Sequence, residues 1–199
     1  MKKGKLFVLT GPSGTGVGEV IKGVNRLRDD ISFVTPITSR KMKQGEVNGH
    51  GFYFYELEEW ENLKANGGLL EHTTFAGNDY GTSKKLVEEI INSGRNVLLN
   101  LEIERAKQIH ENMHDAIFIL IVKESLKKLE ETYIQKKMSD IEIRVRINEA
   151  KKIYQNSGFF NYIVFDDNIS QATEEVNAII TAESCRTEAR LEHIKFWAR

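Results

Sequence analysis

The stretch Lys5-Leu6-Phe7-Val8-Leu9-Thr10-Gly11-Pro12-Ser13-Gly14-Thr15-Gly16 decides the fold. Its first half is a short apolar run, which is typical of a buried strand, and its second half is a glycine-rich turn. From about Glu19 to Leu27 the apolar residues then recur at helical spacing. The order strand, glycine loop, helix predicts a phosphate-binding loop, because the loop N–H groups and the positive end of the helix face the same anion. A simple glycine-rich turn is the alternative, and the flanking strand and helix argue against it.

The same alternation of apolar strand and helix recurs along the chain. Strands are expected at residues 95–101, 116–122 and 162–165, and a polar helix at 103–112. These elements predict an α/β fold, a three-layer sandwich with a parallel central sheet and helices on both faces. Residues 183–199 carry apolar side chains at helical spacing and predict a C-terminal helix that packs on the domain or on a partner.

Residues 32–83 follow a different pattern. Alternating aromatic residues at 51–55 predict a half-exposed strand, residues 58–65 a short helix, and residues 69–75 another strand. We therefore expect an α+β lobe beside the main sheet. Residues 124–156 are expected to be helical and strongly charged, and the pattern alone leaves open whether they form a solvated face or a functional lid.

Composition favours one compact domain, in which any anion is held by a local site. A chain of 199 residues with 40% apolar residues can bury one core, and no linker or repeat divides it. A net charge of -1 argues against a general attraction to nucleic acid or to an anionic membrane. The apolar run at residues 6–10 is too short for a signal peptide or a membrane span, so a cytoplasmic location is expected. The single Cys185 has no metal-ligand spacing around it and is expected to be inert.

The phosphate loop departs from the full motif at two positions. A phosphate loop continues with Lys and then Ser or Thr, because the ammonium spans the outer phosphates and the hydroxyl ligates magnesium. Here those positions are Val17 and Gly18, and Glu19 follows them. The candidate loop residues are Gly11, Ser13, Gly14, Thr15, Gly16, Val17 and Gly18. Loss of one preorganised donor costs about 3 to 4 kcal/mol of transition-state stabilisation, so the loop is expected to hold phosphate weakly and to be a poor catalyst.

From about Lys5 to the C-terminus the chain resembles the guanylate kinases. The phosphate loop, Arg40 to Gly49, Leu70-Glu71 and Gly77 to Thr82 occur in the order and spacing of that family. The resemblance implies transfer of the γ-phosphoryl group of ATP to GMP or dGMP, with Mg²⁺, in a cleft closed by a GMP-binding lobe and a lid. It divides the single domain into a core (1–35, 84–125 and 158–183), a GMP-binding lobe (36–83), a lid with flanking helices (126–157) and a C-terminal helix (184–199).

By resemblance, two arginines and two tyrosines hold the GMP phosphate. Arg40 and Tyr80 stand at two of these positions, whereas Lys43 replaces the second arginine and Phe52 the other tyrosine. Lysine offers a point charge where a guanidinium grips two oxygens, and phenylalanine has no hydroxyl to donate. Affinity for the monophosphate is therefore expected to fall.

The resemblance also implies how the base is recognised. Glu71 stands where the family carboxylate accepts the guanine N1–H and amino group, which adenine cannot reproduce, and Thr82 matches the hydroxyl beside it. Glu102 stands where the family has an aspartate, and its side chain is longer. Pro36 stands where the family usually has a serine. A preference for guanine is thus expected to survive in an altered pocket.

Further departures concern ATP and magnesium. Asn100 replaces the aspartate that anchors the water shell of magnesium, and no metal ligands are assigned. Phe165 replaces the asparagine that meets adenine. In the lid, Arg146 together with Arg144 fits the positions of the arginines that contact the transferring phosphates, and with Arg40 they are the candidate catalytic residues.

Three functions follow from this pattern. The first is a guanylate kinase homologue that binds a guanine nucleotide and has weak or lost phosphoryl transfer. The second is an active guanylate kinase in which basic residues compensate for the missing lysine. The third is a non-catalytic module that binds a protein partner, although nothing in the sequence names one.

Overall fold

The computed structural model describes residues 3–191, and its centre is a five-stranded parallel sheet. The strands are β1 (Leu6–Thr10), β2 (Ile31–Ser32), β7 (Asn96–Asn100), β8 (Ile117–Val122) and β9 (Tyr162–Phe165). Their order is β2-β7-β1-β8-β9, so β1 lies in the middle and pairs with β7 and β8. The parallel sheet expected from the sequence is confirmed.

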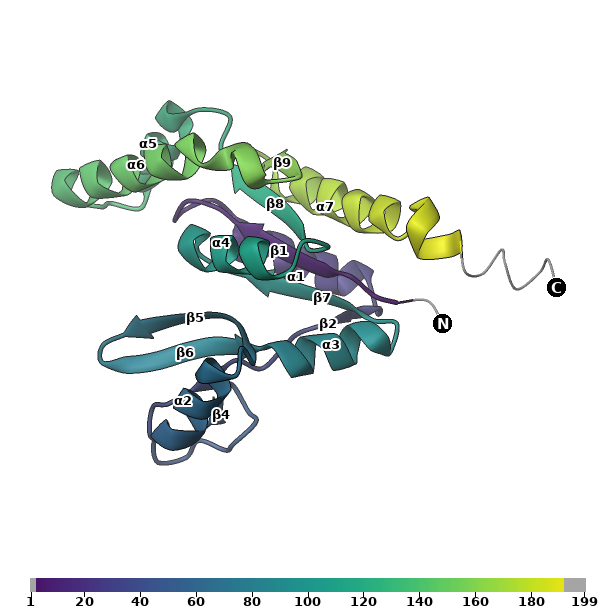
Figure 1. The fold of residues 1–199 in the computed structure, drawn as a ribbon. Coiled ribbons are helices and arrows are strands. Elements are labelled where there is room, and N and C mark those ends of the chain that lie inside the picture. Colours follow the sequence, from purple (N-terminus) through teal and green to yellow (C-terminus); the bar gives the residue numbers. More distant parts are fainter. Residues whose placement is uncertain (1–2, 192–199) are drawn as a thin grey trace.

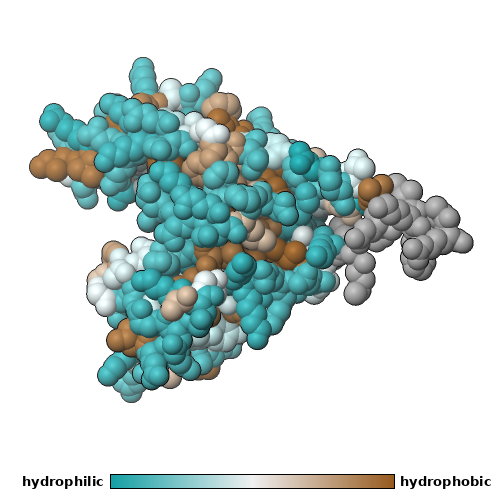
Figure 2. Space-filling model, in the orientation of Figure 1, coloured by the Kyte–Doolittle hydropathy of each residue, from teal (hydrophilic) through white to brown (hydrophobic). Residues whose placement is uncertain are grey.

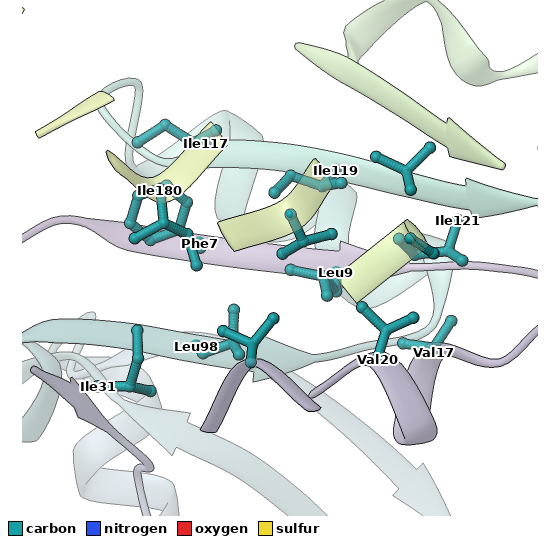
Figure 3. Close-up of a cluster of buried hydrophobic side chains, with 14 residues drawn as sticks. Phe7, Leu9, Val17, Val20, Ile31, Leu98, Ile117, Ile119, Ile121 and Ile180 are labelled. Atoms are coloured by element: carbon teal, nitrogen blue, oxygen red, sulfur yellow. The ribbon is translucent and has the colours of Figure 1, made fainter. Parts of the chain in front are cut away.

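Helices cover both faces of this sheet (Figure 1). Helices α1 (Val17–Leu27) and α7 (Ile169–Glu183) pack on one face, and α3 (Lys84–Asn92) and α4 (Ile103–Asn112) pack on the other. Because successive strand side chains point to opposite faces, Phe7 and Leu9 join the first core cluster, which Figure 3 shows, whereas Leu6 and Val8 join the second. The result is the three-layer α/β sandwich that the sequence predicts.

A second, four-stranded sheet forms a side lobe, residues 36–83. It contains β3 (Ile37–Thr38), β4 (Tyr53–Phe54), α2 (Leu57–Ala65), β5 (Leu69–Phe75) and β6 (Asn78–Ser83), with strand order β4-β3-β6-β5. β5 and β6 pair antiparallel across a turn at Ala76 and Gly77, whose φ angles are 50° and 74°. The expected α+β insertion is therefore present beside the main sheet (Figure 1).

One strand of the lobe is shorter than the sequence predicts, and the charged helical stretch is present. The strand expected at 51–55 is only the two residues of β4, because Gly51 adopts a φ of 81° before it and α2 begins at Leu57 after it. The helical stretch expected at 124–156 is present as two helices, α5 (Leu126–Gln135) and α6 (Asp140–Gln155). Lys137, with a φ of 56°, breaks the helix, and Ser139 caps α6 in a capping box with Glu142.

The C-terminal part of the chain also differs from the expectation. Helix α7 ends at Glu183, and residues 184–186 turn before a helical segment at 187–191, so the helix expected from 184 starts later. The expected apolar positions Ile194 and Trp197 lie outside the described residues.

The carboxyl group of Glu183, at the end of α7, is buried. Burial disfavours its charged form, but hydrogen bonds from Tyr162 and Lys5 outweigh this effect and lower the pKa of Glu183. Within residues 3–191, no helix has both the length and the apolar character that crossing a membrane requires.

The close packing of α1 on α7 gives a test of the fold. A Cβ atom added at Gly23 would lie 2.6 Å from Cγ2 and Oγ1 of Thr173, whereas one added at Gly18 would meet nothing within 4 Å. We expect Gly23→Ala to lower the free energy of unfolding by about 1 to 3 kcal/mol through overpacking. Gly18→Ala should raise it by up to about 1 kcal/mol through helix propensity. Urea unfolding of the two variants measures this, and a Gly23→Ala variant as stable as Gly18→Ala would contradict the packing.

Candidate functional site

The glycine-rich loop lies at the carboxyl edge of the parallel sheet, where open α/β sheets bind ligands. It joins the end of β1 to the start of α1, between the α5–α6 hairpin and the side lobe (Figure 1). Figure 2 shows the surface hollowed between these two units. A cavity of about 820 Å³, lined by Lys5, Ala116 and Tyr162 among others, lies instead at the amino ends of the strands. The predicted site residues are at the opposite edge from this cavity.

Three successive backbone amides of the loop already donate hydrogen bonds within the protein. The N–H of Thr15 donates to the carbonyl oxygen of Pro12 at 3.1 Å, and the N–H of Val17 donates to that of Thr15 at 2.8 Å. The N–H of Gly16 donates to Oδ2 of Asp166 at 2.6 Å. In a phosphate loop such groups point at the bound anion. Here they are engaged by acceptors of the chain itself.

Asp166 brings a negative charge to this loop. It follows β9, is 1% exposed, and lies at the N-terminus of α1, where the helix dipole favours an anion. The ammonium of Lys123 lies 3.1 Å from its other carboxylate oxygen and donates to its backbone oxygen at 2.8 Å. A buried and paired carboxylate therefore occupies part of the anion-binding end of α1.

The two departures from the loop motif have different surroundings. Val17 is 6% exposed and packs in the core with Val20 and Ile121, which Figure 3 labels beside it. Its Cγ2 atom would lie 2.9 Å from a Cβ atom added at Gly11, so its isopropyl group fills space next to the loop. Gly18 faces open space. The side chain that replaces the lysine is thus buried in the core, and the space beside Gly18 is open.

The α5–α6 hairpin lies directly on the loop. The hydroxyl of Tyr133 donates to the backbone oxygen of Ser13, and the guanidinium of Arg146 donates to the Ser13 hydroxyl. The Tyr133 ring would lie 2.6 Å from a Cβ atom added at Gly14, which also has a φ of 91°, so only glycine fits there. Arg144, two positions from Arg146, lies on the exposed side of α6. Of the two predicted lid arginines, the structure brings Arg146 to the loop.

Two tyrosine hydroxyl groups near the loop differ in their partners. Burial raises the pKa of Tyr133, with Arg146 opposing the shift. Burial, together with the charges of Tyr133 and Asp166, raises the pKa of Tyr154 to about 12. The buried Tyr154 hydroxyl makes no hydrogen bond within residues 3–191.

In the side lobe, Arg40 is held by Glu46. The guanidinium donates to both carboxylate oxygens at 3.0 and 2.8 Å. Hydrogen bonds from Arg40 and from the Lys43 backbone, the latter at 2.6 Å, lower the pKa of Glu46 to about 2. The Lys43 side chain itself is exposed. Of the two predicted phosphate-binding cations, Arg40 is thus paired with Glu46 and Lys43 is exposed to solvent.

Arg40, Phe52 and Tyr80 form the aromatic part of this cluster. The Arg40 guanidinium carbon lies 5.7 Å from the Phe52 ring centroid and 5.2 Å from that of Phe54. Phe52 packs edge-on against Tyr80 with centroids 5.7 Å apart. The structure therefore brings three of the four predicted phosphate-binding residues together.

The predicted base-recognition residues Glu71 and Thr82 also meet. They are partners in the β5–β6 register, and the Thr82 hydroxyl donates to Oε1 of the buried Glu71 at 2.6 Å. Arg105, in the first turn of α4, donates to both oxygens of the same carboxylate, from Nη2 at 2.8 Å and from Nε. Glu102 is exposed at the N-cap of α4.

Sequence reasoning missed Glu46, Arg105, Tyr133 and Asp166 as members of the site. Glu46 gives a local signal, since it lies six residues after Arg40 in one short loop. Nothing local marks the other three. Asn100 is the exposed last residue of β7, at the same sheet edge. Over the described ranges, no three His, Cys, Asp or Glu side chains form a group that could hold a metal ion.

The fold and this loop define a protein of the phosphate-loop α/β class, and comparison with known proteins gives the family. The sequence model of the guanylate kinase family matches residues 3–183. A guanylate kinase from Clostridium perfringens (strain SM101 / Type A) is 34% identical over 193 residues, 96% of this chain and 89% of that protein. One from Clostridium tetani is 35% identical, over 94% of this chain and 90% of that protein. The crystal structure of guanylate kinase from Anaplasma phagocytophilum superposes with a TM-score of 0.65 at 25% identity, covering 94% and 89% of the two chains. The chain belongs to the guanylate kinase family.

The two tyrosines give a matched test of the contacts at the loop. Tyr154→Phe removes a buried hydroxyl without a hydrogen bond, so the free energy of unfolding should rise by about 1 kcal/mol. Tyr133→Phe removes the hydrogen bond to Ser13, so it should fall by about 1 kcal/mol. Chemical unfolding at pH 7 measures both. The opposite order of stability would show that the two hydroxyl groups are placed differently.

Proposed function

We propose that this protein is a guanylate kinase homologue that binds guanine nucleotide and transfers phosphate from ATP to GMP slowly or not at all. One observation carries the proposal. The N–H group of Gly16 donates to Asp166, that of Val17 donates to Thr15, and Val17 stands where the motif has its lysine. Electrostatic stabilisation by preorganised donors supplies most of the catalysis of phosphoryl transfer. A loop in which these donors are engaged and the cation is missing lacks much of that stabilisation.

The same loop is a poor partner for ATP. The triphosphate would have to displace the Asp166 carboxylate from Gly16 or lie beside it, and two anions at one helix terminus repel each other. The ligands for Mg²⁺ are also weak, because Gly18 has no hydroxyl group and Asn100 offers a neutral amide. Neither the triphosphate of ATP nor Mg²⁺ fits this chain well.

The side lobe is the better-preserved half of the site, with GMP or dGMP as its expected ligand. Arg40 and Tyr80 lie together near Phe52, and Glu71 lies beside Thr82. GMP would have to draw Arg40 away from Glu46, and Lys43 would contribute a point charge only. We therefore expect a lowered but guanine-selective affinity.

One contact favours a second candidate, an active guanylate kinase with a compensating cation. The Arg146 guanidinium already donates to the hydroxyl of Ser13, a residue of the loop. Arg40 is paired with Glu46, and Lys43 and Arg144 are exposed, so Arg146 is the basic residue among them that could replace the lysine.

Steady-state turnover with ATP, GMP and Mg²⁺ distinguishes the two candidates. We expect a rate below about 1 per second, under the range of about 1 to 100 per second that is typical of kinases. Arg146→Ala should then change the residual rate little. A rate within that range, lost when Arg146 is replaced, would contradict the proposal and favour the second candidate.

The double variant Val17→Lys/Gly18→Thr serves as the positive control. It returns the ammonium and the hydroxyl to the loop, and the threonine has open space to enter. If the loop limits the reaction, this variant should turn over at least about a hundredfold faster than the unmodified chain.

A further inference from the structure

Glu71, the carboxylate expected to accept hydrogen bonds from the base, is already paired with a cation, Arg105. The Glu71 side chain is 0% exposed, and Arg105 donates to both of its oxygens while Thr82 donates to one of them. A carboxylate has about four lone-pair sites, so these three hydrogen bonds use most of its capacity. A base that donates two more hydrogen bonds to Glu71 must displace one of these partners.

Arg105 is held in place by a rigid element. Gln108, one turn later on α4, exchanges two hydrogen bonds with the backbone of His72, at 2.9 and 3.0 Å. His72 follows Glu71 in β5, the edge strand of the side lobe, and α4 lies alongside it (Figure 1). Residues three apart on a helix share a face, so α4 presents Arg105 and Gln108 together to β5. The guanidinium is therefore fixed against Glu71 by a second, neighbouring attachment.

The guanidinium and the guanine base offer Glu71 the same chemistry. A guanidinium presents two parallel N–H groups in one plane, which match the two oxygens of a carboxylate. Guanine presents its N1–H and amino N–H in a similar planar pair, whereas adenine has no N1–H. Arg105 and guanine thus compete for one acceptor, and a base without that pair does not.

We propose that Arg105 is a specificity-determining residue that competes with guanine for Glu71 and so weakens the guanine preference of this site. The inference rests on the proposed function, because it assumes that the monophosphate binds in the side lobe. The competing role, in which Arg105 positions Glu71 to receive the base, predicts the opposite effect of removing it.

Calorimetric titration of the full chain with GMP, IMP and AMP tests the inference. In Arg105→Ala we expect affinity for GMP to rise by at least about tenfold, affinity for IMP to rise less, and affinity for AMP to change by less than about twofold. The sign is informative, because removing a positive charge should by itself weaken the binding of an anionic ligand. Lys107→Ala is the matched control: it removes a cation from the same helix, one that pairs with Glu104 and not with Glu71. It should give no gain for GMP.

The outcomes separate this inference from the proposed function. The inference is overturned if Arg105→Ala binds GMP as well as or more weakly than the unmodified chain. It is also overturned if neither the unmodified chain nor Arg105→Ala binds GMP. A gain that disappears in Glu71→Gln/Arg105→Ala supports it. Where circular dichroism shows that Arg105→Ala does not fold, Arg105→Gln takes its place, with an expected gain of at least about threefold. Turnover with ATP is measured separately, so a normal rate would contradict the proposed function and leave the comparison of affinities standing.

Discussion

The hydrogen bond from the Gly16 N–H to the Asp166 carboxylate is the constraint on which the rest of the site depends. It joins the loop after β1 to the end of β9, 150 residues away in sequence. Lys123 neutralises the buried carboxylate, and the N-terminus of α1 adds its positive end. Breaking such a pair leaves an uncompensated buried charge, which is strongly unfavourable. The loop is therefore stabilised in a conformation that needs no bound phosphate.

The same arrangement recurs in the side lobe. Arg40 is paired with Glu46, and Glu71 is paired with Arg105, so the groups that would bind a phosphate and a base are paired within the chain. Binding a nucleotide exchanges these internal partners for the ligand instead of filling free sites. Such an exchange gains less free energy than pairing with groups that are free, because the desolvated partners left behind carry a cost. A family scaffold with internally paired ligand groups is consistent with weak binding and slow chemistry.

The sequence predicted the core well because burial imposes periodicity. The apolar runs of β1 and β8 and the buried positions of α4 follow directly from which faces are buried. It overestimated the strand at 51–55, of which only Tyr53–Phe54 is formed, and it did not locate the turn at Lys137 that separates α5 from α6. The family motifs predicted Glu71 and Thr82 as base-recognition residues, and the structure places their side chains in contact. Arg105 and Asp166 could not be found, since their partners lie 34 and 150 residues away and no local pattern links them.

The backbone amides of the loop allow the most direct measurement of the central claim. In a ¹⁵N-labelled protein, the amide signals of Gly16 and Val17 report whether a phosphate chain reaches the groups that Asp166 and Thr15 now engage. We predict that both signals stay in place when ATP and Mg²⁺ are added to about 1 mM. A saturable shift of both signals at about 50 μM ATP would mean that the phosphates displace Asp166, and it would contradict the account.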